Sequence, residues 1–215
     1  MDTTMGKHSA GPRSGRPMPS VDQVEGLEAW FAAAPELEAW TRQSFIEDGA
    51  SLQNGDHAHL QNASIGFLWT NVDNAKKGRI VIGTAEPGTP QGAMGKWGRA
   101  KAVMQIEGWF GAVPDFIITI DASWWLQASD AEACALIEHE LYHCAQATDE
   151  FGAPKFNQHT GRPSFTMRGH DVEEFVGVVR RYGAEATGVR ALVDAANAGP
   201  EIAAVDIAQC CGTCI

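Results

Sequence analysis

The chain has 215 residues, of which 44% are hydrophobic and 20% charged, and its formal net charge is −11. This length suits one globular domain, and the apolar content supports a packed core, which excludes a chain that is disordered throughout. The acidic balance argues against nucleic acid as a partner, and no apolar run approaches the length of a membrane span, which argues against a membrane protein.

The two ends of the chain differ in composition from its middle. Residues 1–20 are rich in Gly, Pro and Ser and hold no apolar core segment, so we predict a disordered tail rather than a secretory signal. Three of the five cysteines lie in the C-terminal CCGTC at 210–214. An odd number in this arrangement is not a disulfide framework, so we expect a reducing cytoplasm. The predicted organisation is a tail at 1–20, one domain at 21–198 and a flexible cysteine-containing tail at 199–215.

Helical and β-prone segments follow one another along the first half of the chain. Residues 21–46 predict one or two amphipathic helices, divided by Pro35. Short β-prone runs bounded by turn residues follow at 63–71 and 77–88. The stretch at 89–114 fits either a short helix or an irregular excursion.

The second half contains one clear strand and several helices. β-Branched residues and phenylalanine dominate 115–121, which we predict to be a strand. After the segment that holds the main motif, two more helices are predicted at 170–182 and 184–198. The order of helix, strands and further helices indicates an α+β fold rather than a regular βαβ alternation.

The stretch EHELYHC at 138–144 places His139 and His143 four residues apart, with Glu140 directly after the first. On a helix, this HExxH spacing puts both histidines on one face, where they can bind zinc, with the glutamate as general base. Ser129 followed by Glu132 is a capping-box pattern that predicts where this helix begins.

The predicted end of that helix lies at Gly152 and Pro154, which cannot continue it. On a helical wheel, His143 lies about 40° from His139, and the apolar residues that follow Cys134 centre on the opposite side. A surface helix with two solvated histidines would show the same amphipathic pattern, so the site depends on a third ligand.

A catalytic zinc site takes three protein ligands and leaves one position open. In the predicted helix at 170–182, His170 and Glu174 share a face opposite the apolar residues, and Gly177 leaves that face open. The helix dipole accounts for acidic residues at a helix start but not for a histidine there. His170 is therefore the preferred third ligand, and Glu174 remains the alternative.

Other candidate ligands have weaker support. His57 and His59 form an HxH pair in a polar loop, and a polar loop explains them equally well. Cys211 and Cys214 form a CxxC spacing near the C-terminus, but no second pair of ligands lies nearby in the sequence.

Taken together, DFIITID, ALIEHELYHC and RGHDVEEFVGVVRRYG resemble the putative phage metallopeptidase family, over roughly residues 63–183. The His-Asp pair followed by a phenylalanine a turn later is also similar to the third-ligand helix of the SprT-like and WLM zincins. The resemblance implies a zincin-like fold with a small mixed or antiparallel sheet on the HExxH helix. It also implies zinc ligands at His139, His143 and His170, a catalytic Glu140 and, for a phage-encoded chain, the host cytoplasm. The longer metzincin pattern HExxHxxGxxH is absent from the sequence.

The sequence-based hypothesis is a zinc-dependent metallopeptidase in which Glu140 is the general base for water attack on a peptide bond. Tyr182, Arg168 and His159 are the candidates for stabilising the oxyanion, and the strand within 79–86 could present its edge to an extended substrate. The expected partner is a protein or peptide substrate. The alternative is a non-catalytic zinc-binding structural or assembly protein of a phage, although a purely structural site has no use for Glu140.

Overall fold

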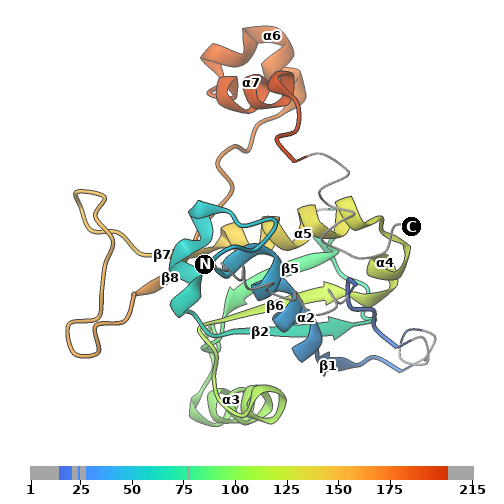
Figure 1. Cartoon of the computed structure of the whole chain (residues 1–215), viewed down its shortest axis with the longest axis vertical. Helices are drawn as coiled ribbons and strands as arrows, with labels where there is room; N and C mark the ends of the chain where they lie inside the picture. The colour runs from blue at the N-terminus through green and yellow to red at the C-terminus, as the bar shows by residue number, and fades with distance from the viewer. Residues whose placement is uncertain (1–14, 21–23, 25–27, 77, 203–215) are drawn as a thin grey trace, which may run out of the picture.

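Figure 1 shows the computed structural model of the chain, which describes residues 15–20, 24, 28–76 and 78–202. At its centre lies a four-stranded mixed sheet with the order β1-β2-β6-β5. These strands are β1 (Phe31–Ala33), β2 (Ile65–Thr70), β6 (Phe116–Asp121) and β5 (Gly83–Pro87). The inner strands β2 and β6 run parallel, and each edge strand runs antiparallel to its neighbour. The predicted α+β class, with a small mixed sheet, is confirmed, and the arrangement is consistent with a zincin-like fold.

The two faces of the sheet pack against different helices, because side chains alternate along a strand. On one face lies the main core, which includes the helix that carries the HExxH motif, α5 (Asp130–His143). On the other face a smaller cluster packs against α3 (Lys96–Phe110). The main core takes Ile65, Phe67 and Trp69 from β2 and Phe116, Ile118 and Ile120 from β6, whereas Leu68 and Ile117 belong to the smaller cluster.

The inner strands match their prediction closely. The run predicted at 63–71 forms β2, and the run predicted at 115–121 forms β6. All six residues of β2 are buried, which explains why a continuous apolar run marks it better than any alternation does. Gly66 in β2 leaves room for the ring of Phe110, which a Cβ atom there would meet at 2.6 Å.

The helix prediction for 21–46 is wrong in its first part among the residues described. Phe31–Ala33 form the edge strand β1, paired with β2, and the ring of Phe31 lies 6.2 Å from that of Trp109. Tertiary pairing overrides the helical pattern there. After Pro35, the prediction is confirmed by α2 (Pro35–Thr41) and a π-helical turn, η1 (Arg42–Ile46).

The region from 75 to 114 resolves into a hairpin, an edge strand and a helix. The predicted strand at 77–88 is divided between the hairpin of β3 (Ala75–Lys76) and β4 (Arg79–Ile80), and β5. Of the two readings left open for 89–114, the structure has the helix, α3. It ends at Phe110 and is capped by Gly111, whose φ of 76° lies in the left-handed region that glycine adopts most readily.

Helix α5 begins where the capping box predicts. After the short helix α4 (Ala122–Gln127), the Ser129 hydroxyl accepts a hydrogen bond from the Glu132 backbone N–H, while the Glu132 carboxylate accepts one from the Ser129 N–H. The predicted end near Gly152 is wrong, because α5 ends at His143.

The chain leaves α5 directly into a two-stranded hairpin, β7 (Cys144–Gln146) and β8 (Phe165–Met167). The ring of His59, from the 3-10 helix η2 (Gly55–Asn62), contacts the Cys144 carbonyl oxygen at 2.7 Å. Backbone groups that a longer helix would bond internally are therefore bonded by the hairpin and by His59.

The predicted helix at 170–182 is wrong in its first turns, because α6 runs over Val176–Ala186 and His170 lies before it in an irregular segment. The apolar face expected for this helix finds no core, since Phe175 is 80% exposed and no residue of α6 is buried. The helix predicted at 184–198 is interrupted after Ala186 and continues as α7 (Arg190–Ala198). Figure 1 shows α6 and α7 standing apart from the sheet.

The predicted tails lie partly outside the described residues, namely 1–14 and 203–215, and the latter range includes the CxxC spacing. Within the predicted N-terminal tail, the side chain of Arg16 is 7% exposed and bonds the corner between α4 and α5. The side chains of Cys134 and Cys144 are buried. In the described part of the chain, no helix is both long and apolar enough to span a membrane.

Candidate metal centre

Helix α5 positions two of the three histidines. His139 and His143 are one turn apart on the same face, and their ring centroids lie 4.9 Å from each other. The opposite face of α5 is anchored in the core by the fully buried Ile137 and Leu141. The same amphipathic pattern that buries one face of the helix therefore directs the histidine pair away from the core.

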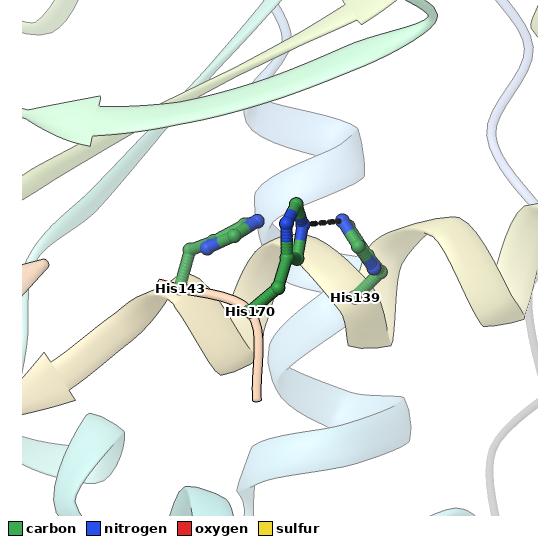
Figure 2. Close-up of side chains that lie close together, drawn as sticks. All are labelled: His139, His143 and His170. Carbon is green, nitrogen blue, oxygen red and sulfur yellow. Dashed lines mark hydrogen bonds between the residues drawn. The ribbon is translucent and has the colours of Figure 1, made fainter. Parts of the chain in front are cut away.

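His170 reaches the pair from the segment that follows β8. The Arg168 backbone N–H donates to the His143 carbonyl oxygen at 2.9 Å, and the His143 Nδ1 lies 2.7 Å from the Arg168 carbonyl oxygen. These contacts fix Arg168 beside the end of α5, two residues before His170. The His170 Nε2 atom consequently lies 3.3 Å from the His139 Nε2 atom (Figure 2).

The three imidazoles form a donor set that fits a transition metal. One ring nitrogen from each histidine lies within 4.8 Å of the others. Tetrahedral zinc with Zn–N bonds of about 2.0–2.1 Å separates two nitrogen ligands by about 3.3 Å, and the His139–His170 separation of 3.3 Å matches this spacing. With Nδ1 donating to the Arg168 carbonyl, His143 keeps its Nε2 lone pair free for a metal.

The electrostatic environment of His139 favours a neutral ring. Burial, followed by the charges of His143 and His170, lowers the pKa of His139. A neutral imidazole is the form that binds a metal, because a protonated ring nitrogen has no lone pair to donate.

Glu140 points from α5 towards the sheet edge and is only 3% exposed. Its carboxylate accepts a hydrogen bond from the Ala85 backbone N–H in β5. Burial raises the pKa of Glu140 to about 7, although His143 and the Ala85 hydrogen bond oppose the rise. A carboxylate with a pKa near neutrality is suited to exchanging protons with a reacting group.

The remaining ligand candidates lie outside this cluster. Glu174 is exposed, and its carboxylate accepts a hydrogen bond from the Phe175 backbone N–H at 2.7 Å. His57 is buried against the ring of Tyr142, and His59 bonds the Cys144 carbonyl oxygen. Within the residues described, only His139, His143 and His170 gather as a group that could hold a metal.

The three oxyanion candidates differ in their relation to the cluster. Arg168 contacts His143 through its backbone, while its guanidinium pairs with Asp171 and lies 5.7 Å from the Tyr142 ring centroid. Tyr182 lies on α6 and is exposed, and His159 is exposed in the long connection between β7 and β8. Of the three, Arg168 is the one whose backbone is hydrogen-bonded to a histidine of the cluster, His143.

Sequence reasoning missed the groups that orient the site. The Arg168 carbonyl and the Ala85 N–H are backbone groups, so no residue type signals them. Gly83, whose missing side chain makes room for Glu140, is one of 23 glycines and carries no distinguishing local pattern. The contact of β5 with α5 identifies Gly83 and the Ala85 N–H, and the contact of the segment after β8 with the end of α5 identifies the Arg168 carbonyl.

Comparison with known proteins gives one family. Residues 38–197, about three quarters of the chain, match the model of the family described as "Putative phage metallopeptidase". The match spans α5, both hairpin strands and the segment with His170. No curated protein and no solved structure matches the chain.

Proposed function

Because the chain belongs to the putative phage metallopeptidase family, we propose that it is a zinc-dependent peptidase that cleaves peptide bonds in protein substrates. A family of metallopeptidases implies a metal cofactor and protein or peptide substrates. The observation that carries the proposal is the cluster of three histidine nitrogens within 4.8 Å, with Glu140 next to His139 on the same helix.

His139, His143 and His170 would hold the metal, and three ligands leave a coordination position open. Bound zinc would supply a Lewis acid that lowers the pKa of water towards neutrality. Glu140 accepts the proton of the attacking water and then donates it to the leaving amine. Its burial and its hydrogen bond from Ala85 support this role, because they hold the carboxylate in one place.

The free edge of β5 is the proposed binding site for an extended substrate. Asp121 N–H donates to the Ile82 carbonyl, and Gly88 N–H donates to the Asp115 carbonyl. In an antiparallel ladder this register turns every second residue towards β6, so the backbone groups of Gly83 and Ala85 face outward. Because the Ala85 N–H is already bonded to Glu140, a peptide would pair by β-augmentation with the Gly83 groups and the Ala85 carbonyl of this edge, next to Glu140.

Metal analysis of the purified protein tests the ligand set. We expect one equivalent of zinc in the wild type and its loss in both His139→Ala and His170→Ala, with Glu174→Ala as the matched control that keeps zinc. Zinc retained without His170 and lost without Glu174 would move the third ligand to Glu174.

Glu140→Gln tests the catalytic role separately from metal binding. The amide keeps the size of the side chain but cannot accept the proton, so we expect normal zinc content and no hydrolysis of an unfolded protein substrate. Full activity in this variant contradicts the mechanism. A wild type that binds zinc and cleaves no substrate would favour the structural or assembly role instead.

A further inference from the structure

We infer that Gly83 is a positioning residue for Glu140, because its missing side chain lets the carboxylate lie against β5, where the Ala85 N–H orients it. This inference rests on the proposed function for the role of Glu140. The contact itself is a structural claim, and it can be tested without any activity.

The steric evidence is direct. A Cβ atom built on Gly83 would lie 2.8 Å from the Glu140 Oε1 atom and 3.0 Å from the Leu136 Cδ1 atom. Real Cβ atoms essentially never approach another heavy atom to less than 3.0 Å. A Cβ atom at Gly83 therefore forces the Glu140 carboxylate, which is the far end of a flexible side chain, to shift away from its position against β5.

The hydrogen-bond evidence comes from the neighbouring residue on the same edge. Ala85 lies two residues after Gly83, so its outward N–H is on the same free edge of β5, and it donates to Glu140. Glu140 is buried, so a carboxylate displaced from this N–H would lose a partner that water cannot easily replace. Gly83 supplies the space and Ala85 supplies the donor.

The conformation of Gly83 does not itself require glycine. Its φ does not lie in the left-handed region, unlike nine other described glycines of the chain, such as Gly111 and Gly152. Replacing glycine by alanine at a compatible position normally stabilises a protein, because it restricts the unfolded chain. A loss of stability in Gly83→Ala therefore indicates the steric contact, whereas a gain in stability indicates a position that accepts alanine.

The experiment is a double-mutant cycle read by urea unfolding with a chelator present, so that metal binding does not contribute. Gly83→Ala is made in the wild type, in Glu140→Gln and in Glu140→Asp, which is shorter by one methylene group. We expect the urea midpoint to fall by about 1 M in the first two backgrounds and by less than half as much in Glu140→Asp. Gly108→Ala, where a Cβ meets nothing within 4 Å, is the matched control and should not lower the midpoint.

Activity and metal content complete the test. In Gly83→Ala we expect zinc content to stay at the wild-type level while kcat falls about 100-fold with little change in KM, because a displaced base impairs only the chemical step. In the Glu140→Asp background, the added alanine should lower kcat much less. Rescue by the shorter acid distinguishes positioning from a general loss of structure.

The outcomes separate the inference from the proposed function. An equal midpoint change in all three backgrounds overturns the inference, and so does a Gly83→Ala variant that is as stable and as active as the wild type. If Gly83→Ala does not fold, folding of the double variant with Glu140→Asp supports the contact, and failure of both contradicts it. A wild type without peptidase activity refutes the proposed function, while the urea cycle still decides whether Gly83 positions Glu140.

Discussion

Replacing Arg16 with alanine should destabilise the fold far more than its place near the N-terminus suggests. The Arg16 guanidinium donates to the carbonyl oxygens of Trp125 and Ala128 at 3.1 and 2.9 Å, and its Nε lies 3.1 Å from the Asp130 carboxylate. It also lies 4.9 Å from the ring centroid of Trp125, which is fully buried. Arg16 therefore joins the end of α4 to the first residue of α5, the helix that carries two of the three histidines.

The size of the effect follows from these contacts. Removing one partner of a buried ion pair costs about 3–5 kcal/mol. The Asp130 side chain is 18% exposed and lies in the first turn of α5, where the helix dipole stabilises a carboxylate. The cost should therefore lie at the low end, about 3 kcal/mol. With a urea m-value of about 2 kcal/mol per M, the midpoint would fall by about 1.5 M.

Urea unfolding of metal-free protein measures this directly. Arg16→Lys keeps the charge but lacks the planar fork that reaches three acceptors, so it should recover only part of the loss. A chain that begins at residue 21, the predicted domain limit, should be destabilised at least as much as Arg16→Ala. A loss below about 1 kcal/mol in Arg16→Ala, the range of an exposed ion pair, would refute the reasoning.

Three further predictions address pH, metal and the C-terminal helices. Burial lowers the pKa of His57 to about 4, so an unfolded histidine near 6.5 binds its proton first, and stability present above pH 6.5 is lost as the pH falls towards 4. The loss in the free energy of unfolding is up to about 3 kcal/mol. Urea unfolding at several pH values should show a weaker pH dependence of this free energy in His57→Phe. Zinc at 1,000 times its Kd should raise the free energy of unfolding by about 4 kcal/mol in the wild type and much less in His170→Ala, measured as a shift in Tm. Phe175→Ser should change stability by no more than about 0.5 kcal/mol, because the side chain is 80% exposed; a larger loss in thermal unfolding would mean that α6 packs on a surface.

Local patterns predicted the elements whose stability is decided locally or by simple burial. The inner strands β2 and β6 are marked by continuous apolar residues because both of their faces are covered. The start of α5 is marked by Ser129 and Glu132, because a capping box satisfies the first backbone donors of a helix within four residues. The spacing of His139 and His143 required only that this helix form.

Predictions failed where a distant segment supplied the partner. Phe31–Ala33 carry a helical pattern but pair with β2, and α5 ends at His143 rather than near Gly152 because β7 pairs with β8. The first turns of the helix predicted from His170 lack a core to cover, and an amphipathic helix gains most of its stability from such packing. His170 and Glu174 both precede α6, so they do not share a helical face, and a helical wheel cannot compare them as ligands.

The sequence by itself determined that a helix of an α+β fold carries His139, Glu140 and His143, because spacing, capping and apolar periodicity act over a few residues. Only the tertiary structure decided which residue joins the pair. His170 does so because both backbone groups of Arg168 are bonded to His143: its N–H to the His143 carbonyl and its carbonyl to the His143 ring. It also decided that Glu140 lies against β5, beside Gly83 and the Ala85 N–H. Contacts with backbone groups far away in the chain leave no trace in residue type, so these parts of the site depend on the fold.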